Sequence, residues 1–453
     1  MSAIVLDTNS DRRFLIVGLG MTGLACARYL LTLGAQVAIA DSRENPPGLD
    51  VLQQEFPDVA VFLGAFDVNL FCRADMLVVS PGVALNTPEI AEAMRQGIPA
   101  IGDIELFLHA AKAPVVAITG SNGKSTVTTM FAEIAKTAGI RVAAGGNLGT
   151  PALDLLADDV ELYVLELSSF QLETTYSLQA SVATVLNIVP DHMDRYDSLE
   201  DYAAAKAKIL YKATVGVYNA DDARVMAMQG SEDALFFTAG ESNDDKSFGI
   251  CHIDGQDWLC RGRKPVLAAS ELKIPGVHNY TNALAAMAMA FALQIDEASI
   301  CQAMRDYRGL PHRTEYVTTI NEVKWFNDSK GTNVGACVAA LNGLALGDGS
   351  KTVLIAGGDC KDANFAELSD VLAKHARAVI LIGRDAGDIA KIIPESVPSM
   401  RAADMGHAVQ LAADSAVARD RVLLSPACAS FDMYKNYMQR GEVFMEAVRR
   451  LAE

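Results

Sequence analysis

The sequence is short of basic residues, and this shortage excludes two classes of partner. It has 38 lysines and arginines against 56 aspartates and glutamates, which gives a net charge of −18. A general nucleic-acid binder or a protein of membrane surfaces needs basic surface to meet phosphate groups. We therefore expect no nucleic-acid or membrane partner, and any anionic ligand must be held by local donors and metal ions.

Cysteine pairs and long apolar runs are also lacking. The eight cysteines include no C-x-x-C pair, a pattern typical of free thiols in a reducing cytosol. The longest apolar run, residues 283–293, is too short to span a bilayer, and no basic region followed by an apolar core opens the chain. These absences predict a soluble, intracellular protein of the cytoplasm.

The sequence does contain enough apolar residues for several cores. Because 51% of the residues are hydrophobic and 21% charged, a chain of 453 residues should be globular throughout and divide into two to four domains. Strand-like runs alternate with helix-like stretches in three series, and a turn-rich stretch at 235–264 indicates a small β excursion. The simplest organisation is three α/β domains, at residues 1–102, 103–309 and 310–453.

Residues 115–126, Val-Val-Ala-Ile-Thr-Gly-Ser-Asn-Gly-Lys-Ser-Thr, form an apolar run that breaks into a glycine turn. Such a turn lets backbone N–H groups converge on phosphate oxygens, and a helix beginning near Lys124 would add its positive end. Lys124 supplies charge for the β- and γ-phosphates, and Ser125 or Thr126 supplies an oxygen for Mg²⁺. This shortened form of the P-loop pattern predicts a nucleoside triphosphate site.

A second glycine turn, Gly18-Leu-Gly-Met-Thr-Gly23, lies between a strand and a helix pattern, and Asp41 ends the next strand. Taken alone, this arrangement is typical of an NAD-dependent dehydrogenase. The motif itself indicates only that a pyrophosphate can bind at a helix N-terminus and that a nearby acid can bind a hydroxyl group. A nucleoside diphosphate sugar has both a pyrophosphate and hydroxyl groups. We favour a nucleoside diphosphate substrate, with an NAD site and a purely structural turn as the alternatives.

Three polar residues of the central region are candidates for chemistry. Glu166 ends an apolar strand, where it is either a satisfied strand-end acid or a metal ligand. His192 follows the next strand among aspartates, and we favour a functional role for it. Lys206 lies in a predicted helix whose lysines would ordinarily face solvent.

The order of these motifs resembles that of the Mur ligases of peptidoglycan precursor synthesis, over essentially the whole chain. The segments that carry the resemblance are 119–125, 145–149, 166–171, 191–194, the helix of Lys206, and 278–282. Within the family, segments 327–333 and 425–430 are similar to those of the members that add D-glutamate. The resemblance implies a Rossmann-like N-terminal domain, a central P-loop-type ATPase domain with a mostly parallel sheet, and a Rossmann-like C-terminal domain.

The implied activity is ATP-dependent ligation of D-glutamate to the L-alanine carboxylate of UDP-N-acetylmuramoyl-L-alanine, through an acyl phosphate and a tetrahedral intermediate, giving ADP and phosphate. The implied cofactors are ATP and two Mg²⁺ ions. The sequence does not give an oligomeric state, and a monomer is the working expectation. A nucleotide-gated regulatory protein would have no need of Lys330, Lys361 and Ser430, and an NAD-linked oxidoreductase is the third possibility.

The resemblance also implies roles for individual residues. ATP is bound by Gly120, Ser121, Asn122, Gly123, Lys124, Ser125, Thr126, Asn279, Asn282, Arg313 and Asp328, and the metals by Ser125, Glu166, His192 and a carbamoylated Lys206. The UDP substrate is bound by Met21, Thr22, Asp41, Ser42, Arg43, Gly82, Asn147 and His192, and D-glutamate by Lys330, Thr332, Lys361, Ser430 and Tyr437. The catalytic set is Lys124, Asn147, Glu166, His192 and Lys206. Related enzymes often have Phe where this chain has Tyr437, and the added hydroxyl has no functional account.

Overall fold

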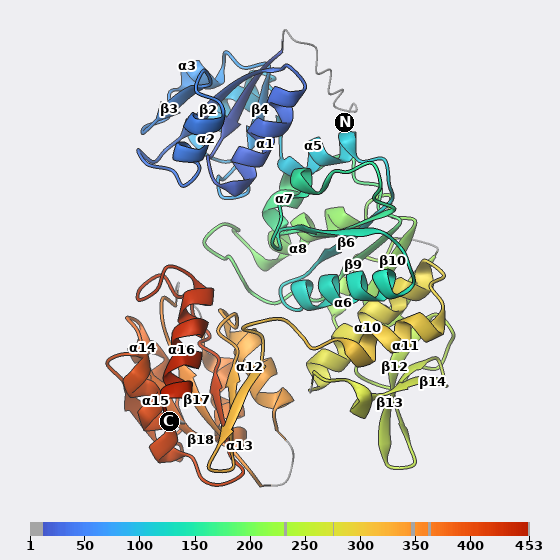
Figure 1. Ribbon diagram of the computed structural model, residues 1–453, viewed down its shortest axis with the longest axis vertical. Coiled ribbons are helices and arrows are strands. Elements are labelled where there is room, and N and C mark those ends of the chain that lie inside the picture. Colours follow the sequence, from blue (N-terminus) through green and yellow to red (C-terminus); the bar gives the residue numbers. More distant parts are fainter. Residues whose placement is uncertain (1–11, 231–232, 275, 346–348, 361–363, 452–453) are drawn as a thin grey trace. The chain divides into compact units, whose positions relative to one another are not determined.

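The computed structural model describes residues 12–230, 233–274, 276–345, 349–360 and 364–451. Within these ranges the chain forms three β-sheets flanked by helices (Figure 1). It divides into two compact units, of which the first comprises Met1–Cys251, Cys260–Val266 and Leu284–Met304 and the second comprises the remainder. No helix in the described ranges carries an apolar stretch long enough to cross a membrane.

The first sheet is parallel and has the strand order β3-β2-β1-β4-β5. Its central strands are short buried apolar runs, which suits a sheet covered by helices on its faces. This arrangement confirms the expected opening β-α-β unit and its Rossmann-like order. The elements are β1 (Arg13–Val17), α1 (Met21–Thr32), β2 (Gln36–Asp41), α2 (Leu49–Glu55), β3 (Ala60–Leu63), α3 (Val68–Phe71), β4 (Met76–Val79), α4 (Pro88–Arg95) and β5 (Ala100–Ile101).

The second sheet has the order β14-β13-β12-β11-β10-β9-β6-β8-β7. Strand β6, whose residues are all buried, runs parallel to β8 and β9 on either side, and helix α6 lies along this part of the sheet (Figure 1). The turn-rich stretch forms β11 to β14, as expected. The elements are α5 (Asp103–Ala110), β6 (Val115–Thr119), α6 (Lys124–Thr137), β7 (Val142–Gly146), η1 (Ala152–Leu155), β8 (Leu162–Glu166), α7 (Ser169–Glu173), β9 (Val182–Val185), α8 (Leu199–Ala207), η2 (Lys208–Leu210), β10 (Val215–Asn219), α9 (Ala223–Met226), β11 (Ala234–Phe237), β12 (Ser247–Ile253), β13 (Gln256–Arg261), β14 (Lys264–Ala268), η3 (Ala269–Glu271), α10 (Val277–Ala292) and α11 (Glu297–Asp306).

The third sheet has the order β15-β16-β20-β17-β18-β19 and is parallel except for β15. The antiparallel hairpin β15–β16 was not expected from the sequence. Its two-residue turn uses Asn321 and Glu322, both with positive φ, in place of the Asn-Gly pair that usually marks such a turn. The elements are β15 (Glu315–Ile320), β16 (Val323–Asn327), α12 (Val334–Gly343), β17 (Thr352–Ala356), α13 (Ala366–His375), β18 (Ala376–Leu381), α14 (Ala386–Ala390), β19 (Ser399–Arg401), α15 (Met405–Ser415), β20 (Arg421–Leu424) and α16 (Tyr437–Leu451).

Helix α5 joins the first two sheets within the first unit. Its apolar side chains Ile104 and Phe107 belong to one continuous buried cluster that also contains Phe14 of β1 and Val115 of β6. The two sheets therefore share one buried apolar cluster within the first unit.

Candidate functional site

The turn after β6 has the backbone conformation of a phosphate cradle. Gly120 has a φ of +152°, and a Cβ atom there would lie 3.2 Å from the backbone nitrogen of Leu186. Gly123 has a φ of +83° and is the residue directly before α6. Both positions therefore require glycine, and the turn directs the first residues of a 14-residue helix toward any bound anion.

The side chains of this turn are well ordered. Lys124 Nζ donates hydrogen bonds to the carbonyl oxygens of Gly120 at 2.8 Å and Ser121 at 2.9 Å, so the ammonium group lies directly over the loop. The N–H of Asn122 donates to Oδ1 of Asn187 at 2.8 Å. Ser125 is fully buried at the start of α6. The predicted helix start at Lys124 is confirmed.

Glu166 lies beside the turn because β8 pairs with β6. In the register of these parallel strands Glu166 is opposite Ile118, which places its carboxylate at the same sheet edge as the glycine turn. The carboxylate is 2% exposed, and Oε1 accepts a hydrogen bond from Nδ2 of Asn147 at 2.8 Å. Glu166 and Asn147, predicted from separate motifs, are thus in direct contact.

Lys206 is buried, which corrects the solvent-facing interpretation of its helix. Its Nζ donates to the carbonyl oxygen of Gly120 at 2.9 Å and to Oγ1 of Thr119 at 3.3 Å, and it lies 4.6 Å from the ring centre of Tyr202. Burial, and after it the charge of Lys124, lower the pKa of Lys206 far below its ordinary value. The sequence of helix Leu199–Ala207 did not indicate that Lys206 is buried, because its alanines fit the buried face and the exposed face of a helix equally well.

His192 is more exposed than this buried group. It has a φ of 56°, its side chain is 40% exposed, and Nε2 is 3.8 Å from Oδ2 of Asp191. Its ring contacts that of Phe170 edge to face at 4.9 Å between centres. Among the described residues, no three or more His, Cys, Asp or Glu side chains are grouped as a metal site. A second metal on His192 and Lys206 therefore depends on the carbamate.

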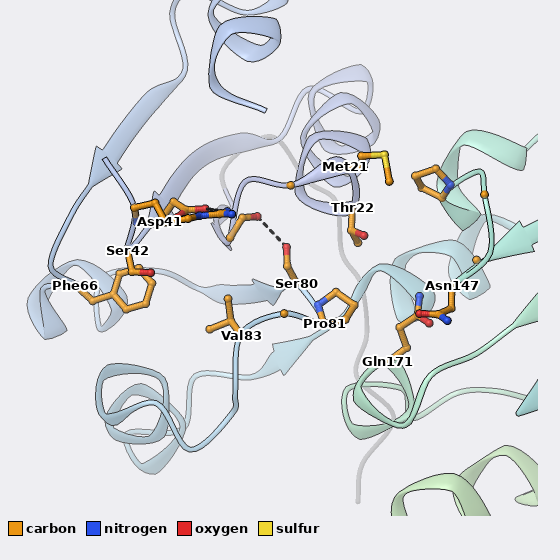
Figure 2. Close-up of a pocket in the computed structure, with 17 residues that line it drawn as sticks. Met21, Thr22, Asp41, Ser42, Phe66, Ser80, Pro81, Val83, Asn147 and Gln171 are labelled. Carbon is orange, nitrogen blue, oxygen red and sulfur yellow. Dashed lines mark hydrogen bonds and ion pairs between the residues drawn. The ribbon is translucent and has the colours of Figure 1, made fainter. Parts of the chain in front are cut away.

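A cavity of about 600 Å³ in the first unit joins the ends of β1, β2 and β4 to the loop after β7 (Figure 2). Every residue predicted for the UDP substrate lines it except His192. Sequence reasoning missed several other lining residues, although Gly18 and Gly20 stand in the glycine motif and Gln171 in the Glu166 motif. The lining residues are Gly18, Gly20, Met21, Thr22, Asp41, Ser42, Arg43, Phe66, Ser80, Pro81, Gly82, Val83, Gly146, Asn147, Gly149, Pro151 and Gln171.

Asp41 is the acidic residue among those that line this cavity. Oδ2 accepts from the N–H of Leu19 at 2.7 Å, and the guanidinium of Arg43 binds both carboxylate oxygens at 2.8 and 2.6 Å. Burial opposes ionisation, but these hydrogen bonds outweigh it and lower the pKa of Asp41 to about 2. The carboxylate therefore ties the glycine turn to the end of β2 and stays ionised at neutral pH.

The remaining residues predicted for ATP lie in the second unit. Nδ2 of Asn282 is 3.4 Å from Oδ1 of Asn279, one turn earlier in α10. Asp328 is buried at the end of β16, where Oδ2 accepts from Oγ of Ser425 at 2.7 Å and Oδ1 accepts from the N–H of Thr314 at 3.0 Å. Burial raises the pKa of Asp328 to about 6, against the lowering effect of these hydrogen bonds.

Of the residues predicted for D-glutamate, Lys330 and Thr332 lie on the loop after β16, Ser430 lies on the loop after β20, and Tyr437 begins α16. Nζ of Lys330 is 4.9 Å from the ring centre of Tyr437, while Thr332 is exposed. A turn follows Ser430, and α16 begins at Tyr437. Lys361 lies outside the described residues.

Arg440, which the sequence did not single out, holds these two loops together. Its guanidinium is buried and donates to Oγ of Ser329 at 3.0 Å and its carbonyl oxygen at 2.8 Å, and to the carbonyl oxygens of Cys428 and Ala429, both at 3.1 Å. Burial lowers the pKa of Arg440 to about 10. An arginine in an amphipathic helix is normally predicted to lie on the surface, so no local sequence pattern indicates that Arg440 is buried.

Comparisons with known proteins agree with this geometry. Three family profiles match in order: "Mur ligase MurD-like, N-terminal domain" over residues 12–102, "Mur ligase middle domain" over 118–290 and "Mur ligase, glutamate ligase domain" over 312–428. The chain is 51% identical to a UDP-N-acetylmuramoylalanine–D-glutamate ligase of Methylobacillus flagellatus, over 97% of both chains, and 49% identical to one of Pseudomonas aeruginosa, over 98% and 99%. The solved structure of UDP-N-acetylmuramate-alanine ligase from Thermotoga maritima is similar in fold, with a TM-score of 0.62 at 19% identity, over 97% of this chain and 99% of that one.

Proposed function

The chain belongs to the Mur ligase family, and we propose that it joins D-glutamate to UDP-N-acetylmuramoyl-L-alanine at the expense of ATP. The observation that carries this is the contact between Asn147 and Glu166. Asn147 lines the cavity that holds the residues predicted for the UDP substrate, and Glu166 ends the strand beside the phosphate loop. One hydrogen bond thus links the site for a nucleotide-borne carboxylate to the site for a triphosphate.

The reaction needs ATP because a carboxylate is a poor electrophile at neutral pH. In the first step a carboxylate oxygen of the L-alanyl group attacks the γ-phosphorus, which forms an acyl phosphate and releases ADP. The neutral amine of D-glutamate then adds to the acyl carbon, and the tetrahedral intermediate loses phosphate and a proton to leave the amide. The first step brings two anions together, so positive charge must be supplied where they meet.

Lys124 and the start of α6 are suited to that task. The ammonium group lies over the loop, and the helix contributes the partial positive charge of its N-terminus. The buried Ser125 hydroxyl and the buried Glu166 carboxylate are hard oxygen donors near the loop, which suits Mg²⁺. When bound, Mg²⁺ would neutralise charge on the transferring phosphoryl group.

Lys206 is proposed to react with CO₂ to form a carbamate. An exposed lysine is a cation at neutral pH, whereas burial of Nζ favours the neutral amine that can attack CO₂ and then lose a proton. The product carries two carboxylate-like oxygens, and these together with His192 would suit a second Mg²⁺. The same buried position that makes Lys206 unusual as a lysine thus makes it usable as a metal ligand.

The second unit is proposed to supply the amino acid. Lys330, Lys361 and Ser430 offer the cationic and hydroxyl partners that the two carboxylates of D-glutamate need, with Thr332 and Tyr437 beside them. Asn279, Asn282, Arg313 and Asp328 remain assigned to the nucleotide. The domain boundaries at residues 102 and 309 and a monomeric state belong to the same proposal.

The reaction is also proposed to take place in the cytoplasm. The eight cysteines are all free thiols, which suits a reducing compartment.

A single assay tests the function. Purified protein with Mg²⁺ and ATP should release phosphate only when both UDP-N-acetylmuramoyl-L-alanine and D-glutamate are present, and mass spectrometry should find the amide product. Dependence on another amino acid would keep the mechanism and refute the specificity. Phosphate release that needs neither substrate would refute the ligase assignment.

A further inference from the structure

Asp103, at the start of α5, is a buried acid whose role is not explained by the fold. It is 2% exposed, and Oδ2 accepts a hydrogen bond from Nε2 of Gln171 at 3.0 Å. We propose that Asp103 is a positioning residue of the substrate cavity, which aims the remaining N–H of the Gln171 amide at an acceptor oxygen of the substrate. This inference rests on the proposed function, because it takes the cavity to be the UDP-substrate site.

The hydrogen bonds of Gln171 leave one donor unassigned. Its Oε1 accepts from the backbone N–H of Ser168 at 3.1 Å and from Oγ of Ser168 at 3.2 Å, and one of its two amide N–H groups is given to Asp103. The second N–H belongs to a side chain that lines the cavity, next to Asn147 in Figure 2. A single directed donor is the kind of group that fixes the orientation of a polar ligand.

The partners of Gln171 also fix which way its amide points. If the oxygen and nitrogen were exchanged, Oε1 would face the carboxylate of Asp103 and Nε2 would face the N–H of Ser168. Both contacts would then be repulsive, so only the observed orientation satisfies both neighbours. Ser168 holds the oxygen end of the amide, and Asp103 holds the nitrogen end.

Burial of the Asp103 carboxyl group costs free energy of folding, so the residue does not merely fill space. Its Oδ1 has no hydrogen-bond partner among the described residues, and no lysine or arginine of those ranges pairs with it. Burial raises its pKa to about 6, although the Gln171 N–H and the first N–H groups of α5 act the other way. A leucine of similar size would avoid this desolvation, so retention of an acid suggests that the acceptor is needed.

Glu105, two residues further along α5, shows what a purely structural acid does here. It is 1% exposed and accepts from the N–H groups of Tyr176 at 2.7 Å and Ser177 at 3.0 Å, which fastens α5 to the segment after α7. Neither partner lines the cavity. Glu105→Gln is therefore a matched control, because it alters an equally buried acid of the same helix without touching Gln171.

The test compares binding and turnover in four variants at pH 8. Calorimetry gives the Kd of UDP-N-acetylmuramoyl-L-alanine without ATP or D-glutamate, and phosphate release gives KM and kcat. We expect Asp103→Leu and Gln171→Leu to weaken substrate binding about tenfold, the usual effect of one lost directed hydrogen bond, with kcat within about twofold. Asp103→Asn, which keeps an acceptor oxygen, should stay within about threefold of the parent chain.

Stability separates positioning from a structural role. Asp103→Leu should leave Tm unchanged or raise it, whereas Glu105→Gln should lower Tm and leave Kd unchanged. An unchanged Kd in Asp103→Leu or Gln171→Leu, or an equal loss of binding in Glu105→Gln, would overturn the proposal. If Asp103→Leu did not fold, the Gln171→Leu and Asp103→Asn results would decide. Failure of the parent chain to bind the substrate at all would instead refute the proposed function.

Discussion

The cavity of the first unit, proposed for the UDP substrate, and the loops of the second unit, proposed for D-glutamate, are built in opposite ways. In the cavity, polar side chains are fixed by neighbours along the wall, as Asp41 is by Leu19 and Arg43, and about 600 Å³ stays open. On the loops, Ser430 is 3% exposed, and Arg440 draws the two segments together from within. The first site is an open cavity whose wall residues hold one another, whereas the second consists of two segments joined by a buried guanidinium.

This difference indicates that the two regions are held in place by different kinds of contact. A continuous apolar core contains residues of both the first and the second sheet, and the cavity and the phosphate loop belong to the same compact unit. The two loops are joined by four hydrogen bonds of one guanidinium and by direct bonds such as that from Ser425 to Asp328, which is a more local form of order. We expect substitutions in the two regions to affect different substrates, and four predictions test this.

The largest effect is expected at Lys206, which serves the phosphate loop rather than either substrate site. Lys206→Ala should lose at least about a thousandfold in kcat, because a metal site that stabilises the transferring phosphoryl group would be incomplete. The Kd of UDP-N-acetylmuramoyl-L-alanine should stay near that of the parent chain. Addition of a small carboxylate such as acetate should restore part of the activity. Full activity in the alanine variant would refute the carbamate.

Arg440→Met should sharpen the contrast between the regions. It leaves the carbonyl oxygens of Cys428 and Ala429 buried without their donor, at a cost of about 3 kcal/mol in the free energy of unfolding. The KM for D-glutamate should rise strongly while binding of the UDP substrate is unchanged. Arg440→Lys, which keeps the charge but not the forked geometry, should be intermediate. Equal losses for both substrates would contradict the separation of the two sites.

Asp41→Asn should show the reverse pattern. Loss of the carboxylate weakens the bidentate contact with Arg43 and the hydrogen bond from Leu19, so the glycine turn is less well fixed. Substrate binding measured by calorimetry should weaken about tenfold, the value of one charge-assisted hydrogen bond. The KM for D-glutamate serves as the internal control and should not change.

The smallest effects concern the pH dependence of stability. Each of the two units contains one buried acid that affects it, Asp103 in the first and Asp328 in the second. The pKa values of Asp103 and Asp328 are both raised to about 6 by burial. An acid with a raised folded pKa adds stability below its unfolded pKa, near 4, and loses that contribution as the pH rises through 6. Relative to the parent chain, Asp103→Asn should therefore gain up to about 3 kcal/mol between pH 4 and pH 7.

Asp328→Asn should gain a similar amount over the same range, because the pH-dependent part is set only by the raised pKa of the parent acid. Its stability at pH 4 should be lower than that of Asp103→Asn, because both carboxylate oxygens of Asp328 accept hydrogen bonds, from Ser425 and Thr314, and an amide can replace only one acceptor. Urea unfolding of the three chains at several pH values measures both quantities. A stability difference between Asp328→Asn and the parent chain that did not change with pH would contradict this account.

Local patterns were sufficient for the elements that a single segment specifies. Strand β6 and the start of α6 were predicted because a buried apolar run and a glycine turn carry their own signal. The same holds for Asp41 at the end of β2, because strand ends of a parallel sheet converge at one edge. The β15–β16 hairpin was missed since its turn lacks glycine, although Asn321 and Glu322 both adopt positive φ.

The sequence by itself determined the fold class and the phosphate loop, because each depends on spacing along one strand, turn or helix, and the family resemblance supplied seven of the 17 residues that line the cavity. Only the tertiary structure decided that Lys206 is buried, that Asp103 holds Gln171, and that Arg440 joins two loops. These three residues gain their roles from partners far away in the chain, and a charged side chain in a short helix has the same local pattern whether it faces water or a distant carbonyl group.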